Sequence, residues 1–359
     1  MNQIEPTSKA SLENLLAEYS KLSLYPVIGA EIEFYLLEEN GQIDALDLDI
    51  PIEREKGKNQ FEVKTGFSRE VAAKIHEIND LKKKIEKQAL KQNMKTSFRA
   101  KPFLDQPGSA LHIHLHLENE LGENLYIKEK DKERDILLYS IGGLCATMEE
   151  NMLLFAPYEE AYLRYQQNTL ESPRKICWGG NNRSAAIRIP IDQKYNRRLE
   201  HRVSCADAEA VEVVIAILYG VLKGIKEKIS PPEKIYGNAF LEQYNYPFLP
   251  QTIEEARSKY QKNQRDFAGE AVLLVEVPAE LGIMVLNSFL ILSSSISSFA
   301  ISMLLSDVLF SFISSISDAR SSKSSILRSL SIFLNNDSSI NSLTLLSSSN
   351  FIKYFIIGS

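Results

Sequence analysis

The strongest constraint on the fold of this chain comes from short segments in which charged or imidazole side chains occupy every second position. In GSALHIHLHLEN, residues 108–119, three of the five histidines of the chain are His112, His114 and His116. Residues two apart on a β-strand share a face, so the three imidazoles point to one side and the leucines and isoleucine to the other. This pattern alone is typical both of a solvated strand face and of a site for a metal ion or a phosphate.

Other segments carry carboxylates and guanidinium groups, two positions apart in GAEIEFYL and RRLEHRV and more widely spaced in the other two. The residues are Glu31 and Glu33 in GAEIEFYL, Glu55 and Glu62 in REKGKNQFE, Arg183 and Arg188 in NNRSAAIRIP, and Arg198, Glu200 and Arg202 in RRLEHRV. Each pair alone would be interpreted as a solvated strand face. Together they favour a shared site, because their strands otherwise carry apolar residues of the kind that form cores.

The chemistry of such a shared site follows from its charges. Two carboxylates 4 Å apart repel by about 4 kcal/mol at an effective dielectric constant of about 20, so clustered glutamates facing one cavity need a cation. Oxygen ligands with an occasional imidazole suit Mg²⁺ or Mn²⁺. Arginine binds phosphate or carboxylate through two parallel hydrogen bonds. An acidic cage beside arginines therefore indicates metal-assisted phosphoryl transfer.

Hydrophobic periodicity predicts an α+β fold with a curved, mainly antiparallel sheet and outer helices, because helices and strands do not alternate regularly. Helices are expected at 8–21, 68–93, 134–156, 207–229 and 252–263. Strands are expected at 26–41, 59–65, 95–103, within 108–119, and at 185–190 and 198–204. We expect three regions: an N-terminal extension at 1–25, a catalytic domain at 26–256, and a serine-rich tail at 257–359.

Composition excludes several classes of protein. The net charge of −6 and the lack of a basic block argue against nucleic-acid binding. Neither GxxxxGK[ST] nor GxGxxG is present, so neither a P-loop nor a Rossmann turn is expected to bind a nucleotide. The three cysteines are far apart and suggest reduced thiols, and the charged N-terminus lacks an apolar leader. We therefore expect a cytoplasmic protein.

The last part of the chain differs in composition. From Leu281 on, about a third of the residues are serine, and residues 281–306 carry no charge. This stretch is long enough to span a bilayer, but it is rich in serine and lacks flanking basic residues. Three interpretations of this stretch remain open: a membrane span, a packed continuation of the domain, and a low-complexity tail, such as one translated in a shifted frame. Of these, the membrane span is disfavoured.

Five motifs in order across residues 26–256 resemble the catalytic domain of the glutamine synthetase family. They are GAEIEF, REKGKNQFE, GSALHIH, NNRSAAIRIP and RRLEHR. The resemblance implies a curved antiparallel sheet whose concave face forms half of a funnel. It also implies a ligase of nitrogen metabolism that uses ATP and Mg²⁺ or Mn²⁺, acts on small molecules and could assemble as a homo-oligomer.

The resemblance further implies roles for the matched residues. The ligands of a first metal, on the acceptor side, would be Glu33, Glu55 and Glu62. The ligands of a second metal, which bridges ATP phosphates, would be Glu31, His112 and Glu200. The nucleotide phosphates would be bound near His114, Arg188 and Arg198. The catalytic residues would be Arg183, Arg202 and Glu171, the last of which would lie in a flap that covers the reaction intermediate. The amino-acid substrate would be contacted by Gly108 and Arg202. No family role is implied for His116.

Four departures from the family pattern bear on activity. Only 28 residues precede GAEIEF, so the N-terminal β-grasp domain of bacterial enzymes is expected to be absent. The arginine expected upstream of Glu171 falls in a gap, and Pro107 replaces the asparagine expected before Gly108. The tail replaces a helical C-terminal region of the family. The sequence thus favours a ligase that makes glutamine or a γ-glutamyl amine, and leaves open a catalytically decayed relative.

Overall fold

The computed structural model describes residues 6–37, 51–130, 132–166, 172–191, 196–266, 342–348 and 351–357. The chain divides into two compact units, Met1–Val275 and Glu276–Ser359. All of the predicted site residues belong to the first unit. The predicted boundaries at residues 25 and 256 stay predictions.

The first unit is built on one sheet with the strand order β2-β3-β1-β5-β8-β7-β6, in which β4 also pairs with β1. The strands are β1 (Tyr25–Leu37), β2 (Ile52–Arg54), β3 (Gln60–Lys64), β4 (Lys95–Ser97), β5 (Leu111–Glu118), β6 (Trp178–Gly179), β7 (Ile187–Arg188) and β8 (Leu199–His201). All pairs are antiparallel except β6 with β7, which are parallel. The predicted α+β fold with a mainly antiparallel sheet is confirmed.

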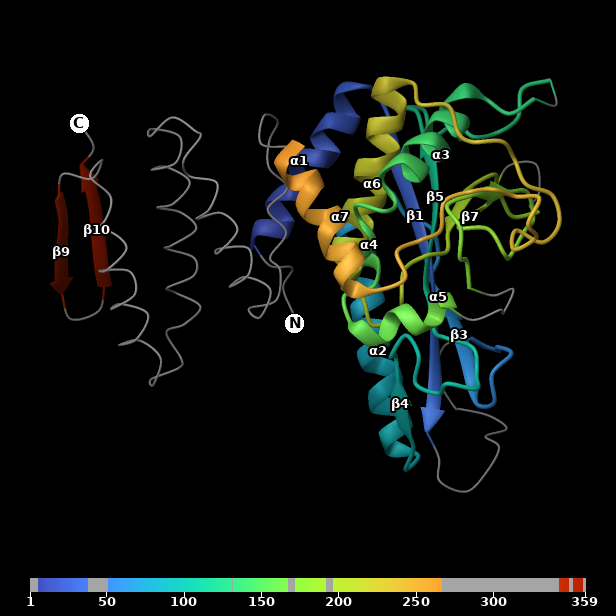
Figure 1. Cartoon of the computed structure of the whole chain (residues 1–359), viewed down its shortest axis with the longest axis horizontal. Coiled ribbons are helices and arrows are strands. Elements are labelled where there is room, and N and C mark those ends of the chain that lie inside the picture. The colour runs from blue at the N-terminus through green and yellow to red at the C-terminus, as the bar shows by residue number, and fades with distance from the viewer. Residues whose placement is uncertain are drawn as a thin grey trace. The chain divides into compact units, whose positions relative to one another are not determined.

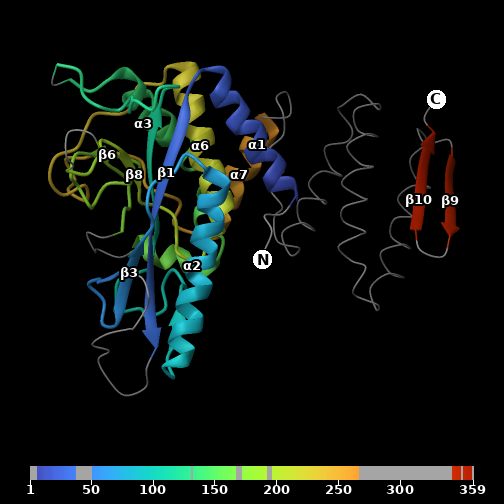
Figure 2. The same ribbon diagram turned by 180° about the vertical axis from the view of Figure 1, so that it is seen from behind.

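The helices gather on one side of the long strands β1 and β5, as Figures 1 and 2 show for α1, α2 and α6. The helices are α1 (Pro6–Lys21), α2 (Val71–Lys91), α3 (Asp135–Thr147), α4 (Met152–Phe155), α5 (Leu163–Gln166), α6 (Ala210–Glu227) and α7 (Ile253–Asp266), with the 3-10 helix η1 (Glu159–Tyr162). Helix α2 packs on β1 and β4, whereas α1 and α3 pack on α6. The short strands flank β1 and β5 within the sheet, with β3 and β2 toward one edge and β8, β7 and β6 toward the other.

The pattern of apolar residues explains this arrangement. In α2, Val71, Ile75, Ile78 and Ile85 form one buried stripe. In β5, the four apolar residues from Leu111 to Leu117 are fully buried, so this face of the sheet packs on the core. The imidazoles of β5 consequently lie on the other face.

Several elements are shorter than the periodicity predicts. The helix expected at 134–156 is divided into α3 and α4, and the strands expected at 95–103 and 185–190 contain three and two paired residues. Between α3 and α4 the polar run Glu149–Asn151 interrupts the apolar pattern, and the N–H of Leu154 bonds to the carbonyl of Asn151 in a new turn. Proline at position 102 cannot donate a ladder hydrogen bond, which limits the first of these strands.

In the described part of the second unit, β9 (Ser342–Ser348) and β10 (Phe351–Ile357) form an antiparallel hairpin. Within the described ranges, the chain has no helix with the length and apolar character that a membrane span requires. Residues 281–306, for which the sequence leaves a membrane span open, lie outside the described residues.

Candidate functional site

The strand register brings the alternating polar residues of the sequence together. Glu31 on β1 is opposite His112 on β5, and Glu33 is opposite Glu62 on β3. On the other side of β5, Glu200 on β8 is opposite His114. Residues that are directly opposite on one face of a sheet have neighbouring side chains. Four strands therefore contribute acidic or imidazole groups to one polar face.

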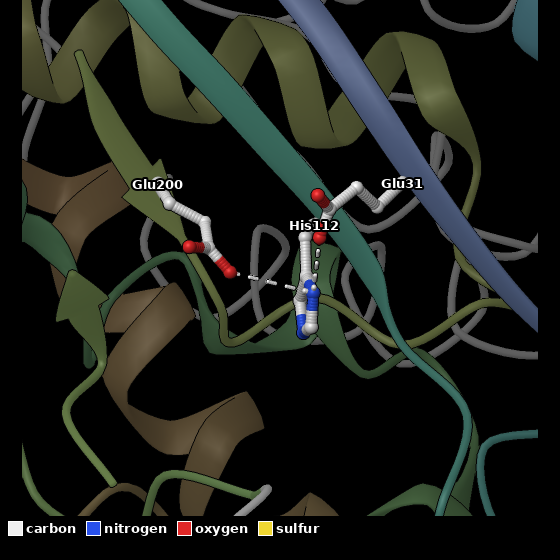
Figure 3. Close-up of side chains that lie close together, drawn as sticks. All are labelled: Glu31, His112 and Glu200. Carbon is white, nitrogen blue, oxygen red and sulfur yellow. Dashed lines mark ion pairs between the residues drawn. The ribbon is translucent and has the colours of Figure 1, made fainter. Parts of the chain in front are cut away.

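His112 is at the centre of this cluster. Its Nδ1 atom lies 3.5 Å from Glu31 Oε2, 3.6 Å from Glu200 Oε1 and 4.0 Å from Glu33 Oε1. Figure 3 shows the carboxyl groups of Glu31 and Glu200 directed toward the imidazole from two sides. The ring is 2 % exposed, and within the described part of the chain neither of its nitrogens has a hydrogen-bond partner. A buried imidazole facing carboxylates without hydrogen bonds is unusual and suggests a ligand between them.

The carboxylates of the cluster are held in unequal protonation states. Burial raises the pKa of Glu33 to about 7 against the opposing charge of Arg164, and the charge of Glu55 adds to the rise. Burial and the charge of Glu31 raise the pKa of Glu62 to about 8. For Glu31 itself, burial acts in the same direction but is outweighed by the two histidines, which hold its pKa below the usual range. The cluster thus contains more negative charge than it can hold without protons or a cation.

Glu200 is stabilised as an anion by two arginines. Its Oε2 accepts a hydrogen bond from Arg188 at 2.7 Å, and its Oε1 accepts one from Arg202. Burial acts to raise the pKa of Glu200, but the charges of Arg202 and His112 lower it to about 2. Arg188 is itself fixed by Asn181, whose Oδ1 accepts from Nε at 3.0 Å and from the terminal nitrogen at 2.6 Å.

These residues fit a divalent cation. Ligand atoms of Glu31, His112 and Glu200 lie within 4.8 Å of one another, and so do those of Glu33, Glu62 and His112. Ligands on opposite sides of an ion with bonds of about 2.1–2.3 Å are about 4.2–4.6 Å apart, which agrees with both groups. Burial and the charge of Arg202 lower the pKa of His112 to about 4, so that a neutral imidazole is available to bind a metal.

The first of these two groups is the set that the resemblance implies for the second metal. The other combines Glu33 and Glu62 with His112. The third residue expected with them, Glu55, lies in the turn between β2 and β3, where its charge acts on both Glu33 and Glu62.

His114 and Arg198 form a second polar contact beside the cluster. Nε of Arg198 donates to His114 Nδ1 at 3.1 Å, and Nε2 of the same ring lies 3.1 Å from Glu31 Oε1. The guanidinium of Arg198 also lies 5.4 Å from the ring centre of Phe67, which is 48 % exposed. His116 lies 3.3 Å from Glu118 and near the same phenyl ring.

The remaining predicted residues lie around this centre or outside the described ranges. Gly108 precedes β5, in a loop that packs on Arg164. Arg183 is exposed and lines an open pocket of about 450 Å³ with Lys234 and Tyr236. Glu171 lies outside the described residues.

Two residues that the sequence did not indicate also belong to this region. Arg164 is 1 % exposed and donates to the carbonyl oxygens of Val203 at 2.6 Å and Arg202 at 3.1 Å. Lys64 on β3 lies 3.1 Å from Glu62. Strand spacing from Glu62 could have revealed Lys64, whereas no local pattern marks Arg164 in its short helix.

Comparison with known proteins agrees with this architecture. Residues 43–274 match the family model described as the catalytic domain of glutamine synthetase. The chain is 29 % identical over 303 residues to gamma-glutamylputrescine synthetase PuuA of Escherichia coli, covering 72 % of this chain and 64 % of that protein. It is 28 % identical over 298 residues to the glutamine synthetase of Pyrococcus horikoshii, covering 72 % and 66 %. The chain therefore belongs to the glutamine synthetase family.

Solved structures show the same fold. A complex described as GmaS/ADP, conformation 1, superposes with a TM-score of 0.65 at 20 % identity, covering 83 % of this chain and 77 % of that one. At this identity the likeness concerns the fold alone. The two curated relatives above are matched over slightly less than two thirds of their own length.

Proposed function

We propose that this protein is an ATP- and divalent-metal-dependent ligase that joins the γ-carboxyl group of glutamate, or of a close analogue, to ammonia or an amine. The single observation that carries the proposal is the convergence of four glutamates on His112 beside two arginines. Family membership and the names of relatives that make γ-glutamyl amines support the same reaction class. A cytoplasmic location, assembly into a homo-oligomer and the choice of Mg²⁺ or Mn²⁺ belong to this proposal as well.

The reaction explains why such a site is needed. A γ-carboxylate is a poor electrophile because its leaving group would be oxide. Transfer of the γ-phosphoryl group of ATP to a carboxylate oxygen gives an acyl phosphate and ADP. The amine then attacks the carbonyl carbon, the bond to the phosphate oxygen breaks, phosphate leaves, and the amine loses a proton. The protein contributes charge neutralisation and positioning.

Each group of site residues has its own role in the proposed reaction. Metal ions held by Glu31, His112 and Glu200, and by Glu33, Glu55 and Glu62, would neutralise the phosphates and the carboxylates around them. Arg188 and Arg202 lie beside this cluster and are suited to the charge of the phosphoryl group. The amino-acid substrate would bind at Gly108. We assign proton removal from the amine to Glu171.

A phosphate-release assay tests the proposal. The full chain is incubated with ATP, Mg²⁺ and glutamate, together with ammonia, methylamine, ethanolamine or putrescine. We expect release that requires glutamate and at least one amine. His112→Ala should abolish it, whereas His76→Ala, which changes an exposed histidine on α2, should not. No release with normal Mg²⁺ binding would favour a decayed relative, and release that is insensitive to His112→Ala would contradict the assigned site.

A further inference from the structure

The loop that carries Gly108 is connected to the sheet by a buried network of hydrogen bonds to which the proposed reaction assigns no role. Gln60 is at its centre, since its Nε2 donates to the carbonyl of Gly108 at 2.9 Å and its Oε1 accepts from the N–H of Gly57 at 3.0 Å. The hydroxyl of Tyr35 donates to the carbonyl of Pro107 at 2.8 Å and lies 3.3 Å from Gln60 Oε1. Both side chains are at most 2 % exposed.

Both ends of this network lead to residues of the first metal site. Gln60 precedes Glu62 by two positions on β3, so the two side chains share a face. The backbone N–H of Glu55 donates to the carbonyl of Gln60 at 2.9 Å. On the other side, the N–H of Ala110, two residues after Gly108, donates to Oε2 of Glu33 at 2.8 Å. The loop at Gly108 is therefore bonded to every segment that carries a predicted ligand of the first metal.

The network is also tightly packed. A Cβ atom at Gly57 would lie 2.1 Å from the hydroxyl of Tyr35 and 2.7 Å from Oε1 of Gln60. A Cβ atom at Gly108 would lie 2.6 Å from the carbonyl oxygen of Ala100. Neither position has room for a side chain, so the β2–β3 turn and the Gly108 loop cannot shift independently without breaking hydrogen bonds.

We propose that Gln60 and Tyr35 are positioning residues that couple the amino-acid site at Gly108 to the first metal site. An ion that fixes Glu33, Glu55 and Glu62 would also fix the Gly108 peptide in the orientation that binds the substrate. Each ligand then raises the affinity for the other by the same factor, as linkage requires. This inference rests on the proposed function, which supplies the metal and the amino-acid substrate.

Calorimetric titration of the full chain with Mn²⁺, in the absence and presence of saturating L-glutamate, measures the coupling directly. For the wild-type protein we expect L-glutamate to tighten Mn²⁺ binding by about fivefold or more, the equivalent of one typical hydrogen bond. Tyr35→Phe removes only the hydroxyl and leaves the ring beside Phe103. This variant should bind Mn²⁺ alone nearly as tightly as the wild type but lose most of the glutamate effect.

The matched control is Tyr19→Phe, which removes another buried tyrosine hydroxyl that donates to a backbone carbonyl, that of Leu218 at 2.7 Å. It should keep the full glutamate effect, although it loses the same kind of hydrogen bond. Gln60→Met provides a second test at the other centre of the network, in case Tyr35→Phe folds poorly.

The outcomes separate the inference from the proposed function. Wild-type coupling that persists in both Tyr35→Phe and Gln60→Met, or wild-type Mn²⁺ binding that L-glutamate does not change, overturns the inference and leaves the metal site intact. A wild-type protein that does not bind Mn²⁺ overturns the proposed function and the inference together. Loss of coupling in Tyr35→Phe but not in Tyr19→Phe supports the inference.

Discussion

Glu200 and Glu62 are both buried beside His112 but lie in opposite electrostatic surroundings, so their replacement by glutamine should change stability in opposite directions. Glu200 is fully buried and paired with Arg188 and Arg202, the second of which is 2 % exposed. Removing one partner of a buried ion pair typically costs about 3–5 kcal/mol. Because glutamine still accepts a hydrogen bond, we expect Glu200→Gln to lower the free energy of unfolding of the metal-free protein by about 3 kcal/mol.

Glu62 is destabilised as an anion. Its pKa rises from 4.5 to about 8 on folding, chiefly through burial and the charge of Glu31. Between these pH values the folded chain holds a proton that the unfolded chain releases, so the free energy of unfolding falls as the pH rises through this window. At about 1.4 kcal/mol for each pKa unit, the upper bound of this destabilisation is about 5 kcal/mol. We expect Glu62→Gln to recover about 1–3 kcal/mol at pH 8 and nearly nothing at about pH 4, below the pKa of the unfolded chain.

Urea unfolding followed by circular dichroism, in the presence of a chelator, measures both effects. Glu227→Gln is the control. Glu227 is an exposed residue of α6, and among the described residues its ion pair is with Lys223. Both cluster variants should weaken Mn²⁺ binding by at least about tenfold even though their stabilities move apart. If Glu62→Gln destabilises the metal-free protein at pH 8 as Glu200→Gln does, the assignment of excess negative charge to this cluster is wrong.

Three further predictions follow from the same geometry. The affinity for Mn²⁺ should rise from pH 6 to pH 8, because binding displaces protons held at the raised pKa values of Glu33 and Glu62; titration in buffers of different ionisation enthalpy counts these protons. Ile113→Ala, at a fully buried position of β5, should lower the free energy of unfolding by about 2–5 kcal/mol, and a loss below about 1 kcal/mol would contradict its place in the core. Arg188→Lys should reduce ligase activity at least about tenfold while stability changes by less than about 1.5 kcal/mol, because lysine cannot contact Asn181 and the phosphoryl group through a planar fork.

The sequence was sufficient to predict which side chains share a face, because strand periodicity depends only on local spacing. Glu31 with Glu33, and His112 with His114, could be placed together in this way. The family motifs then linked these faces into one expected site. The register that puts Glu31 opposite His112 is a long-range property of strand pairing, and only the structure shows it.

Other features had no local signal in the sequence. Arg164 lies in a helix of four residues, and its place beneath Gly108 depends on how that helix packs against the sheet. The network of Gln60 and Tyr35 joins two loops that are far apart in the chain. Short strands such as β7 were overestimated because apolar residues continue past the last paired residue, so composition alone does not mark where pairing stops.

The distribution of the cluster over β3, β1, β5 and β8 also determines when in folding the site can exist. Glu31 and Glu200 come from distant parts of the chain and from strands that are separated by β5. A nascent chain must therefore complete most of its non-local strand pairing before any cation can be chelated, a late and slow event for such topologies. Divalent ions would consequently prolong the lifetime of the finished fold by mass action, without guiding the early steps that lead to it.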